Sequence, residues 1–94
     1  MSKKHIPSKI KFSSEAAADI LFWEKSGNKK ALKKIQELIA DCLKTPYSGI
    51  GSPEQLRYQD VDTYSRRIDR VNRLVYRVEG EALIILSARY HYEK

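Results

Sequence analysis

Several kinds of residue are scarce in this 94-residue chain, and each scarcity excludes a class of protein. The single cysteine, Cys42, cannot form a disulfide within the chain, so we expect a cytoplasmic protein and no disulfide scaffold. Two histidines and one cysteine do not make a metal-ligand set, so we expect no metal and no cofactor. No apolar run approaches the roughly 20 residues of a membrane span, and none follows the charged residues 1–5 as in a signal peptide.

Positive charge is abundant: 18 Lys and Arg stand against 12 Asp and Glu, which gives a net charge of +6. Before residue 54 every basic residue is a lysine, and from Arg57 onward all are arginines except Lys94. The planar fork of arginine binds phosphate in a bidentate manner, whereas lysine acts as a mobile point charge. As a set, the arginines indicate a polyanionic partner. For any single arginine, pairing with a nearby acid is an equal alternative: Asp60, Asp62, Asp69, Glu79 or Glu81.

The first half of the chain has the pattern of a helical hairpin. Ser13 offers an N-cap to a first helix, and Gly27 is suited to end it. Asn28 can cap a second helix that Thr45-Pro46 stops. The apolar residues of this second helix recur at three- and four-residue spacing: Leu32, Ile35, Leu38, Ile39, Cys42 and Leu43. Lysines lie mostly off that stripe: Lys29, Lys30, Lys33, Lys34 and Lys44.

The second half must supply the opposing layer, because two helices cannot enclose a core alone. Residues 46–53 have the composition of a loop, and 79–81 (Glu-Gly-Glu) that of a hairpin turn. Three β-branched and aromatic stretches predict strands: 64–71, 73–78 and 82–88. With a short strand at 10–12, we predict an α+β fold: strand, helical hairpin, then an antiparallel β-meander packed on the helices. Residues 1–94 form one domain in this prediction, with residues 1–8 as a loose arm.

Alternation along the predicted strands separates an apolar face, suited to the helices, from a polar face. In the last strand Leu86, Ala88 and Tyr90 fall on the apolar side, and Ser87 falls on the other. The polar face carries guanidinium groups and an imidazole: Arg67, Arg73, Arg77, Arg89 and His91. Arg66 points instead towards the core side, and we expect it to reach water near a sheet edge.

Such a polar face suits single-stranded nucleic acid, because arginines meet phosphates and tyrosine rings stack on bases at about 1–3 kcal/mol per base. With a general base and a general acid, the same groups can cleave RNA through attack of the ribose 2′-OH on the adjacent phosphorus. Each candidate has another reading: Glu54 as a turn cap, His91 as a surface residue and Tyr92 as a C-terminal anchor. Spacing alone therefore does not separate an enzyme from a basic binding module.

Four motifs stand in order along the chain: 45–56 (Thr-Pro-Tyr-Ser-Gly-Ile-Gly-Ser-Pro-Glu-Gln-Leu), 65–68 (Ser-Arg-Arg-Ile), 72–76 (Asn-Arg-Leu-Val-Tyr) and 88–92 (Ala-Arg-Tyr-His-Tyr). Together they resemble the YoeB/Txe family of the RelE toxin superfamily, whose loop has the form T-P-F-x-G-x-G-x-P-E-x-L. The resemblance extends from about Lys9 to Tyr92. The chain departs from the family pattern at Tyr64, where tryptophan or phenylalanine is expected, and at the added residues Glu93 and Lys94.

This resemblance implies the toxin of a type II toxin–antitoxin system, an mRNA interferase that cleaves mRNA in the ribosomal A site without a metal. By position, Glu54 matches the general base, His91 the general acid, Arg73 the phosphate-stabilising arginine and Tyr92 the terminal tyrosine that shapes the site. The implied partners are the ribosome, mRNA and a YefM/Phd-type antitoxin. The family also implies a homodimer.

Further basic residues are candidates for RNA binding. Arg57 and Arg67 fall where the family contacts RNA or transition-state charge. On the second helix we expect salt-sensitive affinity for the ribosome from Lys29, Lys30, Lys33 and Lys34. Two other functions remain open: a ParE-like inhibitor of DNA gyrase without nuclease activity, and a simple RNA-binding or co-repressor module. The combination of Glu54, His91 and Tyr92 argues against a non-catalytic inhibitor.

Overall fold

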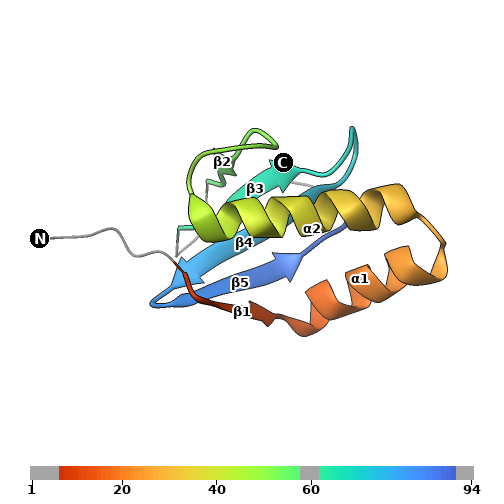
Figure 1. Cartoon of the computed structure of the whole chain (residues 1–94), viewed down its shortest axis with the longest axis horizontal. Helices are drawn as coiled ribbons and strands as arrows, with labels where there is room; N and C mark the ends of the chain where they lie inside the picture. Colours follow the sequence, from red (N-terminus) through yellow and green to blue (C-terminus); the bar gives the residue numbers. More distant parts are fainter. Residues whose placement is uncertain (1–6, 58–61, 91–94) are drawn as a thin grey trace, which may run out of the picture.

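The structure, a computed structural model, describes residues 7–57 and 62–90 (Figure 1). Its elements follow in the order β1 (Lys9–Phe12), α1 (Ser14–Lys25), α2 (Lys29–Lys44), β2 (Glu54–Gln55), β3 (Tyr64–Arg67), β4 (Arg73–Glu79) and β5 (Ala82–Ser87). The predicted α+β class, with its strand, helical hairpin and meander, is confirmed. Most of the predicted arm, residues 1–6, lies outside the described residues. Within the described ranges, no helix is long and apolar enough to cross a membrane.

The two helices begin and end at the residues that the sequence indicated. The Ser13 side chain accepts a hydrogen bond from the Ala16 amide at 3.0 Å, and α1 ends just before Gly27, whose φ is +73°. Asn28 caps α2 in the same way, through the Ala31 amide at 3.0 Å. One face of α2 packs into the core, at positions spaced three and four apart: Ala31, Ile35, Leu38 and Cys42.

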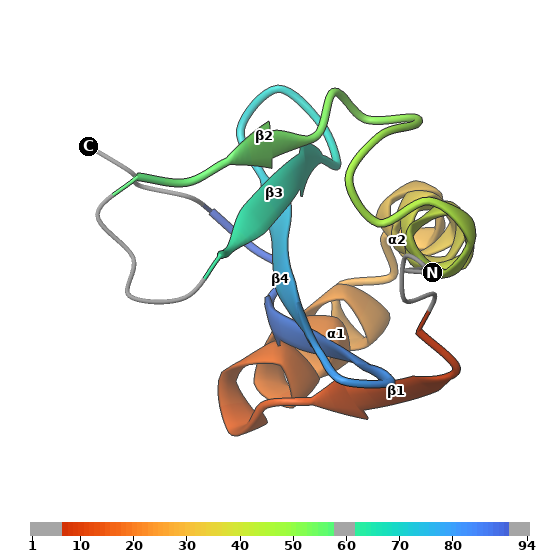
Figure 2. The ribbon, with the colours of Figure 1, turned by 90° about the vertical axis from the view of Figure 1, so that its left-hand side faces the viewer.

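A five-stranded sheet lies against the helices, in the order β1-β5-β4-β3-β2. β1 runs parallel to β5, and the other neighbours are antiparallel. Figure 2 shows β2 and β3 at one end of the sheet and β1 at the other. The helical hairpin therefore connects the two edges of the sheet, and a side chain on β2 lies far from β1.

Two boundaries differ from the sequence prediction. β3 ends at Arg67 rather than at residue 71, because the Asp69 carboxylate accepts hydrogen bonds from the amides of Val71 and Asn72 at 2.9 and 2.7 Å. Such a side-chain bond to the backbone two or three residues onward builds a turn. β2 was not predicted as a strand at all, and it has only two residues.

β5 contains a β-bulge that plain alternation did not foresee. Val75 pairs with Ser87 and Tyr76 with Ile85, so Leu86 is an extra residue on β5. Strict alternation would put Ile85 and Ser87 on one face, whereas the bulge puts them on opposite faces. Ile85 is thereby fully buried against the helices, and Ser87 lies on the polar face as predicted.

The core between helices and sheet includes a thiol and a phenol. Cys42 of α2 and Tyr76 of β4 are both fully buried. Burial raises the pKa of Cys42 to about 11 and that of Tyr76 still further. Both groups are therefore neutral at physiological pH.

Candidate functional site

The face of the sheet that points away from the helices holds the candidate catalytic groups. Glu54, Ser65 and Val75 are successive cross-strand partners, so they share this face. The adjacent row contains Tyr64, Tyr76 and Ile85, which belong to the core side. Arg73 lies two residues before Val75 on β4, and it therefore projects from the same face as Glu54.

Arg73 is held on this face by contacts from β2, from β3 and from the loop that precedes β2. Its Nε donates to the Ser65 Oγ at 2.8 Å, and its Nη2 lies 3.6 Å from the Glu54 Oε1. The same Nη2 is 3.4 Å from the carbonyl oxygens of Ser52 and Ser65. The Arg73 side chain is 12% exposed and the Glu54 side chain 66%. A fixed guanidinium thus lies beside a carboxylate that solvent and ligands can reach.

Ser65 is a site residue that sequence reasoning did not identify. It is fully buried, and its hydroxyl fixes the plane of the Arg73 guanidinium through Nε. The sequence did contain an indication of Ser65, because this residue begins the family motif at 65–68. Its role could be recognised only once the register of β3 against β4 was known.

Arg66 projects from β3 on the opposite face, toward the core, as the alternation predicted. The expectation that it reaches water near a sheet edge is wrong, since the residue is 0% exposed. Each of its five N–H groups has an acceptor: the Tyr76 hydroxyl at 3.0 Å, the Asp41 carboxylate at 2.6 Å, and the carbonyls of Ile50 (3.2 Å), Thr45 (2.6 Å) and Ser48 (2.8 Å). Burial lowers the pKa of Arg66, but the bonds to Tyr76 and Asp41 raise it more, so the group stays charged.

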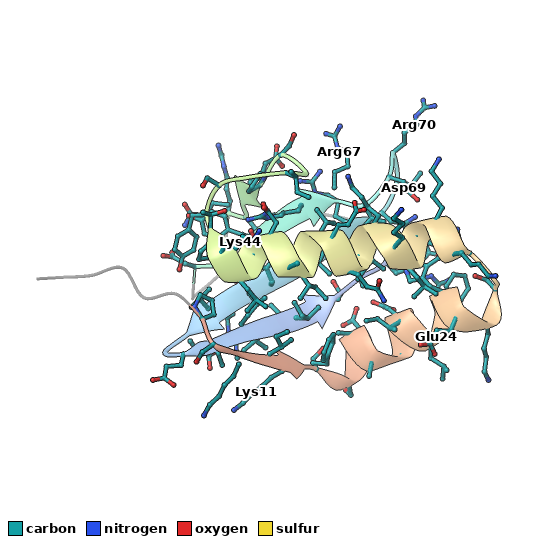
Figure 3. All side chains as sticks on the ribbon, in the orientation of Figure 1. Lys11, Glu24, Lys44, Arg67, Asp69 and Arg70 are labelled. Carbon is teal, nitrogen blue, oxygen red and sulfur yellow. The ribbon has the colours of Figure 1, made fainter. Side chains whose placement is uncertain are left out.

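Of the other arginines, some are exposed and available to a ligand, and others are already in contact with side chains of the protein. Arg67 is exposed and is the direct cross-strand partner of Arg73, and Arg57 is exposed just beyond β2. Figure 3 shows Arg67 pointing away from the ribbon, as Arg70 does on the following turn. Arg77 is engaged by Glu79 at 2.6 Å. Arg89 stacks on the ring of Phe22, with 3.5 Å from its guanidinium carbon to the ring centroid.

The candidate lysines belong to a different surface. Lys29, Lys30, Lys33 and Lys34 lie on α2, in the helical layer on the far side of the sheet from Arg73. Three of them border a hollow of about 480 Å³ between α2 and the β3–β4 turn, lined by Asn28, Lys30, Ala31, Lys33, Lys34, Glu37, Ile68 and Asp69. The structure therefore brings Glu54, Arg73 and Arg67 together, but not these lysines with them.

His91 and Tyr92 lie outside the described residues. The segment that leads to them is anchored: Ala88 receives a hydrogen bond from the Trp23 indole at 2.8 Å and donates its amide to Asp19 at 2.9 Å. The Tyr90 amide donates to the Asn72 side chain at 2.7 Å, and Tyr90 has a φ of +58°. Asp19 and Asn72 thus fix the backbone at Ala88 and Tyr90, which the sequence did not reveal. Among the residues that the structure describes, no three His, Cys, Asp or Glu side chains form a metal-binding group.

Several known proteins are similar to this chain in both sequence and fold. Toxin YoeB of Escherichia coli K12 is 43% identical over 84 residues, which cover 89% of this chain and 99% of that protein. A YoeB/ParE toxin from Agrobacterium tumefaciens superimposes with a TM-score of 0.84 at 34% identity, covering 90% of this chain and all of the other. Staphylococcus aureus YoeB in its heterotetrameric complex with YefM gives a TM-score of 0.80 at 39% identity, covering 89% and 97%.

A match at the level of the whole family agrees with these individual likenesses. Residues 12–92, and so most of the chain, match the YoeB-like toxin of bacterial type II toxin–antitoxin systems. The match includes β2 with Glu54, β3 with its two arginines, and β4 with Arg73. Sequence, fold and relatives agree, and the chain belongs to the family of YoeB-like toxins of bacterial type II toxin–antitoxin systems.

Proposed function

We propose that this toxin is a cytoplasmic, ribosome-dependent endoribonuclease that cleaves mRNA in the ribosomal A site. The observation that carries the proposal is the pair of Glu54 and Arg73, a reachable carboxylate 3.6 Å from a fixed guanidinium on the polar face of the sheet. Membership of the YoeB-like family adds support.

In the proposed reaction, protein side chains alone move the protons. Glu54 accepts the proton of the ribose 2′-OH, and the 2′ oxygen forms a bond to the adjacent phosphorus. The bond from phosphorus to the 5′ oxygen breaks, and His91 gives a proton to the departing oxygen. The products are a 2′,3′-cyclic phosphate and a 5′-hydroxyl end. Tyr92 shapes the site beside His91.

Arg73 stabilises the charge that develops on the phosphorus. Its Nε and Nη2 are engaged by the protein, which fixes the plane of the guanidinium. No described residue accepts from Nη1, so its N–H groups are available to a phosphate oxygen. Preorganised donors of this kind are often the largest single contribution to catalysis.

The pairing of Arg67 with Arg73 supports an anionic ligand on this face. Like charges directly opposite each other on neighbouring strands destabilise a sheet. A phosphate between or above the two guanidinium groups relieves that repulsion. Arg57 is exposed two residues after the end of β2 and extends the positive charge along the same proposed RNA path. The lysines of α2 add affinity for the ribosome from the helical side.

We further propose a YefM/Phd-type antitoxin as the inhibitor, as in the Staphylococcus aureus YoeB–YefM complex, and a homodimer, as in the Staphylococcus aureus YoeB dimer. An antitoxin segment that lays acidic and apolar residues across the arginine face would block it. Such a complex dissociates more readily at high salt, though incompletely, because its apolar contacts persist.

The test combines purified ribosomes, a defined mRNA and mapping of the RNA ends. Wild-type toxin is expected to produce new 5′-hydroxyl ends in the A-site codon, and Glu54→Gln is expected to abolish them. Glu79→Gln is the matched control, because Glu79 also pairs with an arginine of β4 but outside the site. Supercoiling by DNA gyrase is measured in parallel. Inhibited gyrase with intact mRNA would establish the ParE-like alternative instead.

A further inference from the structure

The strand that carries Glu54 is too short to fix the position of that carboxylate by itself. β2 has two residues, paired with Ser65 and Tyr64, and one further backbone bond joins the Leu56 amide to the Thr63 carbonyl at 2.7 Å. It is also the edge of the sheet, without a second neighbour. A strand in a globular protein usually has about five or six residues. The position of Glu54 must therefore depend on the segment that leads into β2.

That segment is fixed by the buried guanidinium of Arg66. Carbonyl groups of Thr45, Ser48 and Ile50 all accept from it, at 2.6, 2.8 and 3.2 Å. The Tyr76 hydroxyl, which accepts from the Arg66 Nε, donates in turn to the Pro46 carbonyl at 2.7 Å. The backbone from 45 to 50 is thus wrapped around one side chain of β3.

Asp41 completes this arrangement from the last turn of α2. Its Oδ2 accepts from the Arg66 Nη1 at 2.6 Å and from the Ile50 amide at 3.0 Å. Gly49 leaves the space that the carboxylate occupies, since a side chain at this position would overlap the Asp41 Oδ2. Gly49 also has a φ of +121°, which other residues rarely adopt.

The anchored loop passes directly into the site. The Gly51 carbonyl accepts from the Arg67 amide at 2.7 Å, and the Ser52 carbonyl lies 3.4 Å from the Arg73 Nη2. Glu54 follows two residues later. We propose that Asp41 and Arg66 are positioning residues, which hold residues 45–50 and thereby set the distance between the Glu54 carboxylate and the Arg73 guanidinium. This inference rests on the proposed function, because it assigns a role to Glu54 in the reaction.

Loss of this anchor should affect the chemical step and leave binding intact. Asp41 is not on the polar face, and its side chain is 24% exposed. The basic groups proposed to hold RNA or ribosome, such as Arg67 and the lysines of α2, are unchanged when Asp41 is replaced. A misplacement of a catalytic group by about 1 Å can reduce a rate by roughly 100-fold.

Two variants break the anchor in independent ways. Asp41→Asn removes the charge and one acceptor, and Gly49→Ala displaces the carboxylate while leaving Asp41 in the chain. Glu24→Gln is the matched control, because it removes the same charge from an exposed position on the other helix, α1. Cleavage of ribosome-bound mRNA is measured in single turnover at several toxin concentrations, and circular dichroism gives the folded fraction.

Both anchor variants are expected to cleave about 10- to 100-fold more slowly at saturation, with half-saturating concentrations within about twofold of wild type. Glu24→Gln should match wild type in both quantities. Wild-type saturating rates in folded Asp41→Asn and Gly49→Ala would overturn the inference, as would losses explained wholly by the unfolded fraction. Glu54→Gln is measured alongside: if it is inactive while Asp41→Asn is fully active, the positioning role fails and the proposed function stands. If Glu54→Gln cleaves normally, the role of Glu54 fails first.

Discussion

Arg66 and Arg67 are neighbours on β3 but belong to two different regions of the molecule. Arg66 faces the core, is fully buried, and has an acceptor for every N–H group. Arg67 faces the polar side, is exposed, and stands opposite another arginine. A guanidinium whose donors are all satisfied inside the protein has none left for a ligand. In this arginine-rich toxin, the face of the sheet from which an arginine projects therefore separates structural arginines from ligand-binding ones.

Replacing each of these two arginines by methionine should give the largest contrast. Arg66→Met strands the Asp41 carboxylate and several carbonyl groups, so the free energy of unfolding should fall by about 3–5 kcal/mol. Arg67→Met leaves no buried group without a partner and should change it by less than about 0.5 kcal/mol. Urea unfolding followed by Trp23 fluorescence measures both. Equal destabilisation by the two substitutions would contradict the assignment of Arg66 to the core.

A second contrast lies along β4, between Arg73 and Arg77. Lysine keeps the charge but loses the planar fork, so Arg73→Lys should lower the saturating cleavage rate by about 10²–10³-fold with a smaller loss of ribosome binding. Arg77 is engaged by Glu79, and Arg77→Lys should leave cleavage nearly unchanged. Rates and affinities from the same ribosome assay provide the comparison. If binding and rate fall equally for Arg73→Lys, this arginine only docks the RNA.

The lysines of α2 sharpen the same division on the helical side. Replacing Lys29, Lys30, Lys33 and Lys34 by glutamine should weaken ribosome binding about tenfold and reduce its salt dependence. The saturating cleavage rate should not change, because these residues lie on the far side of the sheet from Arg73. A control that removes equal charge elsewhere replaces Lys9, Lys11, Lys25 and Lys44. Equal weakening by both sets would mean that only net charge matters.

The smallest expected effect is on pH dependence and concerns the partner of the buried arginine. The hydrogen bond from Arg66 holds the pKa of Asp41 below its ordinary value of 3.8. A lowered folded-state pKa contributes stability that is present above the ordinary value and is lost as the pH falls through the lowered one. The stability advantage of wild type over Asp41→Asn should therefore shrink on acidification below about pH 4. Urea unfolding at several pH values between 7 and 3 tests this, and a constant difference would refute it.

Local chemistry made much of this fold predictable. The caps at Ser13 and Asn28, the apolar stripe of α2 and the two faces of β4 follow from short-range preferences that the structure obeys. β2 and the bulge at Leu86 were not predictable, because both depend on contacts between distant segments. The environment of Arg66 was missed for the same reason: its acceptors come from α2, the following loop and β4.

The candidate site was only partly accessible from the residues themselves. Alternation placed Arg67 and Arg73 on a polar face, and the register of the sheet agrees. Glu54 entered through family resemblance, since neither its spacing nor its neighbours in sequence indicated a base. Its proximity to Arg73 depends on the fold of residues 45–52, which no local pattern encodes. The roles of His91 and Tyr92 remain predictions from that resemblance.

The buried thiol of Cys42 can be used to measure how often the core of this protein opens to solvent. The thiolate is the form that reacts with alkylating reagents, and in the native protein the thiol is both covered by the core and shifted to a pKa of about 11. Because the chain has one cysteine, alkylation reports only on events that expose Cys42, which lies in the core between α2 and the sheet. An antitoxin that restrains the opening of the fold would slow the alkylation of Cys42. One that covers only the arginine face would leave the alkylation rate equal to that of the free toxin.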